Sequence, residues 1–471
     1  MGAHGIDTLR LSAEDALGLL ERGEATSREL WEAYRAAIDA QNPELNAFLT
    51  LVDEPEGDGI PIAIKDVIST KGIRTTAGSK ILEPYVPVFD ATVAARCKAA
   101  SMPCLGKTNT DEFAMGSSTE NSAYGPTHNP WDLDRVPGGS GGGSAAAVAA
   151  GLAPWALGSD TGGSIKLPSA FCGNVGLRPT YGTVSRYGVV AFASSLDQVG
   201  PVTRNVRDNA LLYRIISGRD VHDSTTVDVP PVLLPESEDL KGLRIGLPRQ
   251  LNDLDGIEPG VKAAVASAIA LAESLGAEID ECELPLSVDY GLPCYYLIAP
   301  AEASANLARF DGVRYGARSD GPDFREMVMR TRHDFLGDES KRRIMIGTYA
   351  LSSGYYDAYY GTAQKVRTVI KREHDALFEK FDLLISPTCA TTAFRLGEKS
   401  ADPLAMYLTD VLTIPSNMAG LPGLSIPCGL SDGLPVGLQL VGPQFSENLL
   451  YRAGHALEGA IGFDPVPGRL A

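Results

Sequence analysis

The sequence predicts a compact α/β enzyme, and three observations support this class. Hydrophobic residues make up 44% of the 471 residues and charged residues 21%. The 50 glycines and 31 prolines favour a loop-rich globular protein over a fibrous or disordered chain. Short β-rich runs alternate with longer helical patterns along much of the chain. The length leaves the number of domains open, because large α/β enzymes can fold as one unit.

The first expected elements are two amphipathic helices within residues 12–42. Ser12 and Thr26 each precede a helical pattern that carries an acid in its first turn, as N-capping residues do. We expect these helices to act as scaffold or interface. The β-rich run 59–68 follows, and it is expected to bring Lys65 into apolar surroundings because apolar residues flank that lysine.

The second half of the chain continues the alternation of strands and helices. The Pro- and acid-rich stretch 223–240 predicts a surface connection, which could mark a domain boundary. Beyond it, we expect a strand at 243–248, a helix at 260–276, an acidic strand, a long helical stretch at 340–380 and strands at 382–387, 424–427 and 436–442.

Charge and cysteine content argue against several classes of protein. The 41 basic and 59 acidic residues leave a formal charge of −18, which disfavours broad nucleic-acid binding by this chain alone. Seven cysteines without a CxxC pair and six histidines without a ligand spacing predict neither a disulfide framework nor a metal site. Residues 1–10 lack an apolar core, and the apolar run 145–158 is too short for a bilayer. We therefore expect a cytoplasmic protein without a membrane segment.

The richest glycine and serine region, residues 136–176, is the first candidate for a functional site. A flexible linker is the alternative, since Gly/Ser runs usually are linkers, but an Ala-rich helical pattern and a second glycine turn follow at once. Ser164 ends that second turn, where a helix is expected to start. At the start of a helix, backbone N–H groups have no intrahelical partners and can bind a developing oxyanion. The turn residues Thr161, Gly162 and Gly163 are the predicted oxyanion hole.

A serine nucleophile also needs a base, and the sequence offers an unusual one. None of the histidines lies in a serine-hydrolase pattern, and no GxSxG elbow surrounds Ser164. Lysine can act as the base only when it is neutral, which desolvation can achieve. Lys65 is the best candidate. The alternative is an ordinary surface lysine or one paired with a carboxylate such as Asp66.

Four stretches resemble the signature of the amidase signature family. They are AIKD at 63–66, GGSGGGSAAA at 138–147, GSDTGGSIK at 158–166 and FCGNVGLRPT at 171–180. The resemblance implies an α/β/α sandwich around a large mixed β-sheet, with 1–471 as a single amidase domain and a signature core at about 60–205.

The same resemblance implies a Ser–Ser–Lys triad. Lys65 is the base, Ser140 the proton relay on a cis peptide, and Ser164 the nucleophile that forms an acyl-enzyme. The two serines of the family triad lie twenty-four positions apart, as they do here (164 − 140 = 24). One position departs from the usual GGSSGGS pattern, because Gly141 replaces the second serine of the pair. That change puts an auxiliary hydrogen bond from this position in doubt.

Later stretches resemble the A subunits of the tRNA-dependent amidotransferases within this family. They are TDEFAMGSSTENS at 110–122, AFASSLDQVGP at 191–201, RFDGVRYG at 309–316 and LSSGYYDAYY at 351–360. The resemblance implies a glutaminase that supplies ammonia to a partner, in a complex with B and C subunits. The partner uses ATP and Mg²⁺ to amidate mischarged Glu-tRNA(Gln), Asp-tRNA(Asn) or both, and it provides most of the tRNA contacts. No cofactor is expected in this chain.

The resemblance also points to residues that recognise glutamine. Arg343 is assigned to the α-carboxylate and Asp410 to the α-ammonium, with Tyr295 or its neighbour Tyr296 as a further contact. An arginine fork suits a carboxylate. Without the resemblance, the arginine would be interpreted as a helix-surface charge and the aspartate as a cap. The tyrosines of the run 351–360 have i, i+4 spacing and favour helix packing over RNA stacking.

Two other functions remain open from the sequence. A free-standing amidase of small carboxamides would use the same triad without any partner. A scaffold that only docks partner subunits would need no triad, and the joint presence of Lys65, Ser140 and Ser164 argues against it.

Overall fold

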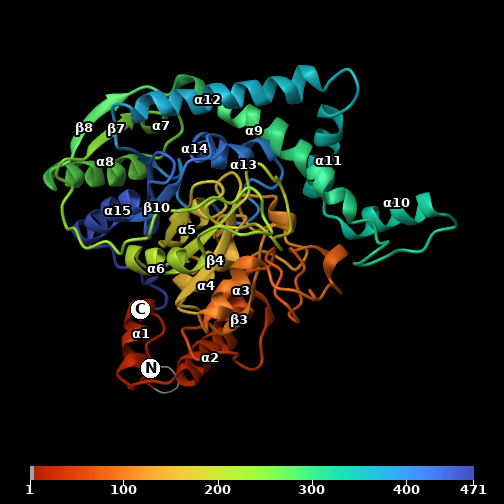
Figure 1. Cartoon of the computed structure of the whole chain (residues 1–471), viewed down its shortest axis with the longest axis horizontal. Helices are drawn as coiled ribbons and strands as arrows, with labels where there is room; N and C mark the ends of the chain where they lie inside the picture. The colour runs from red at the N-terminus through yellow and green to blue at the C-terminus, as the bar shows by residue number, and fades with distance from the viewer. Residues whose placement is uncertain (1–4) are drawn as a thin grey trace.

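A large mixed β-sheet forms the centre of the computed structural model, which describes residues 5–471 (Figure 1). Residues 1–4 of the expected polar N-terminal segment lie outside the described part. Eleven strands follow the order β1-β3-β2-β4-β6-β5-β10-β11-β9-β7-β8. They are β1 Phe48–Leu51, β2 Ile62–Lys65, β3 Cys104–Thr108, β4 Trp155–Asp160, β5 Val175–Arg178, β6 Gln198–Thr203, β7 Arg244–Pro248, β8 Glu278–Cys282, β9 Leu383–Pro387, β10 Gly423–Ser431 and β11 Leu434–Val441.

Helices cover both faces of this sheet. They are α1 Ala13–Glu21, α2 Ser27–Leu45, α3 Thr92–Ala99, α4 Gly142–Ala149, α5 Lys166–Cys172, α6 Val206–Ile216, α7 Arg249–Asn252, α8 Pro259–Ser274, α9 Pro285–Asn306, α10 Phe324–Phe335, α11 Asp338–Ala350, α12 Thr362–Phe378, α13 Pro403–Tyr407, α14 Ile414–Met418 and α15 Glu447–Ile461. The core around α3, α6, α8 and α15 lies on one face, and the cores around α2, α4 and α5 lie on the other. The predicted α/β/α arrangement around a mixed sheet is confirmed.

Strand β2 shows how the sheet separates these two cores. Its residues Ile62 and Ile64 join the core that contains α6 and α15, whereas Ala63 joins the core that contains α4. Side chains alternate between faces along a strand. Lys65 therefore points toward the face that α4 covers.

Both N-terminal helices begin where the capping pattern predicts. The Ser12 hydroxyl accepts a hydrogen bond from the amide of Asp15 at the start of α1. Thr26 and Glu29 form a reciprocal capping box at the start of α2. These side chains satisfy backbone N–H groups that have no partner inside the helix.

The expected long helical stretch at 340–380 is two helices rather than one. Helix α11 ends at Ala350 and α12 begins at Thr362, with a short π-helical turn between them. Gly354 has a φ of +89°, which a continuing right-handed helix cannot contain, so the chain turns here. The tyrosine rings beyond it do form i, i+4 contacts, with centroids 5.8 Å apart for Tyr355 and Tyr359.

The connection at 223–240 contains no helix or strand. Strands from before and after it lie in the same sheet, where β5 pairs with β10. Within residues 5–471, no helix combines the length and apolar character needed to cross a membrane. The same residues contain no cluster of three or more His, Cys, Asp or Glu side chains arranged for a metal ion.

Candidate active site

Lys65 is buried on the α4 side of the sheet, next to Ser140. Its Nζ lies 2.8 Å from Ser140 Oγ and 3.1 Å from the carbonyl oxygen of Ser159. The side chain is fully buried. The alternative of a surface lysine is therefore wrong for this position.

The alternative of an ion pair between Lys65 and Asp66 is also wrong. Asp66 follows Lys65 directly, but its carboxylate accepts hydrogen bonds from the amide and hydroxyl of Thr76. Its other oxygen lies 3.5 Å from Nζ of Lys107, a second buried lysine. Lys65 and Asp66 thus serve separate polar clusters.

Burial lowers the pKa of Lys65 from 10.5 to about 7. Desolvation is the largest cause, because a charged ammonium loses its water in this position. The negative charges of Asp111, Asp160 and Asp197 oppose this effect and raise the pKa. The net result leaves a large neutral fraction near pH 7, as a lysine base requires.

Ser140 lies at the start of the Ala-rich helix α4. The Gly139–Ser140 peptide bond is cis, as the resemblance implies. The glycine and serine run leads directly into α4, and every residue of α4 is buried. The region is therefore part of the core, and the linker alternative is wrong.

The two glycine-rich turns contact each other through Gly141 and Ser164. The amide of Gly141 donates a hydrogen bond to the carbonyl oxygen of Ser164 at 3.1 Å. A Cβ atom at Gly141 would lie 2.5 Å from that same oxygen. Glycine at this position allows the close approach, so the departure from the family pattern has a steric basis in this chain.

Ser164 ends the turn between β4 and α5, and Asp160 fixes the conformation of this turn. The Asp160 carboxylate accepts the amides of Ile165 at 2.9 Å and Lys166 at 3.3 Å. It also accepts a hydrogen bond from Asn417 Nδ2 at 2.6 Å. Ser164 itself is 6% exposed, which leaves its side chain at the edge of the buried region.

Backbone amides in this turn are available to a ligand. Within residues 5–471, the N–H groups of Gly162, Gly163 and Ser164 donate no hydrogen bond. Thr161 is held by its side chain, because its hydroxyl donates to Asp197 at 2.7 Å. Together these groups can stabilise negative charge on an oxygen atom.

The predicted glutamine contacts Tyr295 and Asp410 lie against the same turn. A Cβ atom at Gly162 would lie 2.9 Å from the Tyr295 ring, and one at Gly163 would lie 2.9 Å from Asp410 Oδ1. The hydroxyl of Thr413 donates to the carbonyl of Gly162 at 2.7 Å. Both glycines therefore make room for protein side chains next to the turn.

Asp410 uses only one of its two carboxylate oxygens in hydrogen bonds among the described residues. Its Oδ2 accepts the hydroxyl of Ser117 at 2.6 Å, while its Oδ1 is buried without a hydrogen bond. Burial raises the pKa of Asp410 from 3.8 to about 7, although the Ser117 hydrogen bond and Arg343 act in the opposite direction. Within residues 5–471 neither carboxylate oxygen accepts a backbone amide of a helix, so the interpretation of Asp410 as a cap is wrong. The unpartnered oxygen suits a cationic group of a ligand.

Arg343 is buried in α11 and is surrounded by aromatic rings. It is 3% exposed, so the alternative of a helix-surface charge is wrong. Its guanidinium lies 5.4 Å from the ring centroids of Tyr296 and Tyr407 and 5.6 Å from that of Phe192. Tyr295 thus adjoins the glycine turn, and Tyr296 adjoins Arg343.

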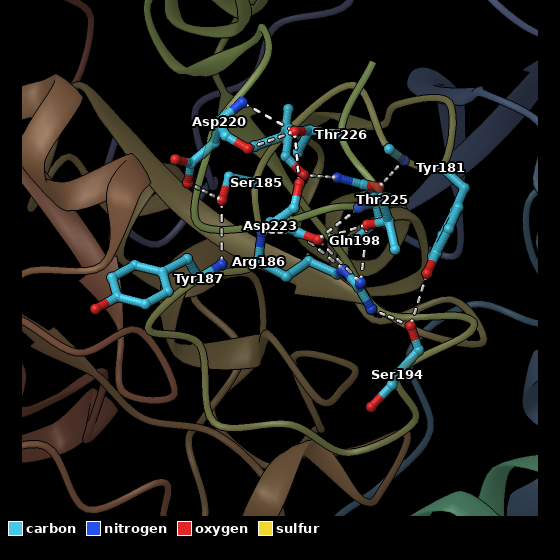
Figure 2. A network of polar contacts seen from close by, with 12 residues as sticks. Tyr181, Ser185, Arg186, Tyr187, Ser194, Gln198, Asp220, Asp223, Thr225 and Thr226 are labelled. Atoms are coloured by element: carbon cyan, nitrogen blue, oxygen red, sulfur yellow. Dashed lines mark hydrogen bonds and ion pairs between the residues drawn. The ribbon is translucent and has the colours of Figure 1, made fainter.

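Asp197, which accepts the Thr161 hydroxyl, ends the loop between β5 and β6. Figure 2 shows a polar network that includes residues of this loop such as Arg186. The amide of Arg186 donates to Asp223 at 2.9 Å, and Arg186 Nη2 donates to Thr225 at 2.9 Å. Gln198 Nε2 donates to the carbonyl of Val184 at 2.9 Å. The first residues of the 223–240 connection therefore brace the loop that carries Asp197.

Several polar groups of the site were not singled out from the sequence. Asp160 and Asp197 lie inside the family-like runs, and that placement was the signal available for them. Ser117 also lies in such a run. Thr413 and Asn417 lie outside all of these runs, and their contacts with the turn depend on the fold alone.

Comparison with known proteins shows the family to which the chain belongs. The family model described as Amidase matches residues 53–451. The chain belongs to the amidase signature family. It is 56% identical to the A subunit of the glutamyl-tRNA(Gln) amidotransferase from Roseiflexus sp. (strain RS-1), over 95% of this chain and 96% of that protein. The corresponding A subunit from Moorella thermoacetica is also 56% identical, with the same two coverages.

Two solved structures share the fold of this chain. The A subunit of the glutamyl-tRNA(Gln) amidotransferase from Thermotoga maritima is 46% identical, with a TM-score of 0.84 over 97% of this chain and 96% of that one. A 6-aminohexanoate cyclic dimer hydrolase with bound substrate is 29% identical, with a TM-score of 0.86 over 99% and 100%. The same fold therefore occurs in an amidotransferase subunit and in a hydrolase.

Proposed function

We propose that the chain is the glutaminase subunit of a tRNA-dependent amidotransferase and that all of 1–471 acts as one amidase domain. The contact of 2.8 Å between Nζ of the buried Lys65 and Oγ of Ser140 is the observation that carries the chemistry. Identities of 53–56% to A subunits, over nearly the whole chain, support the assignment to this branch of the family.

The first step of the proposed reaction is attack by Ser164. Neutral Lys65 accepts the proton of Ser140, and Ser140 accepts the proton of Ser164. The Ser164 oxygen forms a bond to the side-chain carboxamide carbon of glutamine. Negative charge develops on the carboxamide oxygen, and the amides of the turn formed by Thr161, Gly162 and Gly163 stabilise it.

The second step releases ammonia and then glutamate. When the tetrahedral intermediate collapses, the C–N bond breaks and the leaving nitrogen takes up the proton that Lys65 held, through Ser140. This leaves a γ-glutamyl ester on Ser164. Water then attacks the ester, with the same lysine and serine moving its proton, and glutamate leaves.

Glutamine recognition rests on two buried charges. Arg343 binds the α-carboxylate through its terminal nitrogens, and the free oxygen of Asp410 binds the α-ammonium. Tyr295 lies against Gly162 of the turn and limits the space for the glutamine side chain there. Charged anchors of this kind favour an amino-acid amide over a simple or aryl amide, and they argue against the free-standing amidase.

The ammonia passes to a partner subunit, and the chain thereby takes part in protein biosynthesis. In this proposal B and C subunits assemble with the chain, and the ATP- and Mg²⁺-dependent partner amidates the mischarged tRNA. The chain itself uses no cofactor. Its net charge of −18 agrees with tRNA binding mainly through the partner.

The direct test uses the Ser164→Ala variant in the assembled complex. Glutamine hydrolysis and glutamine-dependent tRNA amidation should both be lost, while amidation with added ammonium salt should continue. The matched control is Ser267→Ala on α8, an exposed position that should leave all three activities unchanged. Glutamine hydrolysis by the Ser164 variant at the wild-type rate would overturn the proposal. A high rate on simple amides that ignores partners would favour the free-standing amidase.

A further inference from the structure

A hydrogen bond joins the two segments that carry the proposed glutamine anchors. Arg343 lies in α11, and Asp410 lies in the short helical turn Leu408–Asp410 that follows α13. The hydroxyl of Tyr407, at the end of α13, donates to Glu339 Oε1 of α11 at 2.9 Å, across 68 positions of sequence. This bond spans the gap between the segment with the cationic anchor and the segment with the anionic one.

Glu339 also orients the guanidinium of Arg343. The same Oε1 atom accepts Arg343 Nε at 2.7 Å. Within residues 5–471, the terminal nitrogens Nη1 and Nη2 make no hydrogen bond, so they remain available to a carboxylate. Glu339 is 10% exposed at its side chain, and Arg343 is 3% exposed, so water screens the pair little.

Aromatic packing supports the same arrangement. The rings of Tyr296 and Tyr407 stack with centroids 4.0 Å apart. Both rings lie 5.4 Å from the Arg343 guanidinium. Tyr407 therefore contacts the arginine through its ring and Glu339 through its hydroxyl, and it stands three positions before Asp410.

We infer that Glu339 and Tyr407 are positioning residues that set the separation between Arg343 and Asp410. A substrate with both an α-carboxylate and an α-ammonium must fit that separation, whereas an amide with one of the two groups need not. The Glu339–Tyr407 contact thus makes the site selective for the complete amino-acid end of glutamine. This inference rests on the proposed function, because it uses the proposed roles of both anchors.

The test compares glutamine with two truncated amides. Glutaramate keeps the carboxylate and lacks the α-ammonium, and 4-aminobutanamide keeps the ammonium and lacks the carboxylate. Tyr407→Phe removes the hydroxyl and retains the ring. In the assembled complex, it should raise KM for glutamine about tenfold while kcat changes little, and it should leave KM for both truncated amides within about twofold.

Conservative and control variants distinguish a positioning role from a general loss of structure. Glu339→Gln keeps an oxygen acceptor and should retain a KM for glutamine near wild type, while Glu339→Ala should raise it about tenfold. Tyr290→Phe, at an exposed tyrosine on α9, should change nothing. Melting temperatures of all variants should stay close to wild type.

The outcomes distinguish this inference from the proposed function. Two results for Tyr407→Phe would overturn the positioning role: equal KM changes for all three substrates, or an unchanged KM for glutamine. The proposed function would stand in either case if the wild-type complex still prefers glutamine. A wild-type complex that does not prefer glutamine over either truncated amide would overturn the proposed function, and the positioning role with it.

Discussion

Lys65 and Asp66 are adjacent in the sequence but belong to separate buried clusters. Lys65 Nζ lies 2.8 Å from Ser140 Oγ, and Asp66 Oδ1 lies 3.5 Å from Lys107 Nζ. Because the neighbouring carboxylate is directed to another lysine, no direct ion pair within residues 5–471 holds Lys65 in its charged form. Desolvation then dominates and brings the pKa of Lys65 down to about 7.

The first prediction concerns the pH dependence of amide cleavage. A lysine base acts when neutral, so kcat/KM should be low below its pKa and rise with pH through about 7. Asp410 also has a pKa raised to about 7, and it must be ionised to bind an ammonium. For glutamine, both groups should therefore contribute to the acidic limb, which should be steeper than for a substrate without an ammonium.

Glutaramate isolates the contribution of Lys65, because it has no ammonium for Asp410 to bind. Its kcat/KM should rise with pH as a single titration near 7. The range from about pH 5.5 to about pH 8.5 extends about 1.5 units on either side of the expected pKa. A kcat/KM for glutaramate that does not change over this range would be inconsistent with a neutral lysine base. Steady-state rates of ammonia release at each pH provide the measurement.

The second prediction concerns Gly141. A Cβ atom here would lie 2.5 Å from the backbone oxygen of Ser164, so Gly141→Ala should push the two turns apart. We expect a loss of about 1–3 kcal/mol in the free energy of unfolding. We also expect a fall in kcat of at least about tenfold, since the nucleophile moves relative to its base.

A glycine with free space around it provides the control for this variant. Gly459 lies in α15, and among the described residues nothing beyond its chain neighbours and the adjacent helix backbone lies within 4 Å of the position that its Cβ would take. Gly459→Ala should leave kcat unchanged and should stabilise the helix by about 0.5–1 kcal/mol. Denaturant unfolding measures the stability of both variants, and initial rates measure their kcat. If Gly141→Ala kept the wild-type kcat and stability, the predicted steric clash with Ser164 would be wrong.

The third prediction concerns the cationic anchor. Arg343→Lys keeps the charge but removes the planar fork, so KM for glutamine should rise about 10-fold or more with little change in kcat. The exposed Arg372→Lys on α12 is the matched control and should leave KM unchanged. A fall in kcat with KM unaltered would mean that Arg343 acts on the chemical step and not on binding.

The fourth prediction concerns the anionic anchor. Asp410→Asn keeps the size and the hydrogen bond from Ser117 but removes the negative charge. KM for glutamine should rise about 10-fold or more, and KM for glutaramate should stay near wild type because that amide has no ammonium. Similar changes for both amides would point to a structural role of Asp410 in the turn.

Local sequence rules predict the parts of this fold that depend on neighbours in the chain. Ser12 and Thr26 cap helices because the partners of their side chains lie within three residues. The same rules missed the break between α11 and α12, because helical composition on both sides of Gly354 obscured the single residue with a positive φ.

The contacts within the candidate site could not be predicted from local sequence rules. An apolar flank indicated that Lys65 is buried, but its contact with Ser140 depends on how β2 and α4 pack together. Contacts such as Thr413 with Gly162 join residues 251 positions apart. No pattern within a short window encodes such contacts, and the resemblance to a family was needed to bring Arg343 and Asp410 into the prediction.

The central claim is that Ser164 forms an acyl-enzyme with the γ-glutamyl group of glutamine. Rapid acid quenching of the assembled complex with glutamine, followed by peptide mass spectrometry, tests it most directly. We predict one γ-glutamyl ester on the peptide that contains Ser164, removed by hydroxylamine and absent from the Ser164→Ala variant. A γ-glutamyl group on another residue, such as Ser140 or Cys172, with Ser164 unmodified during turnover, would contradict the account.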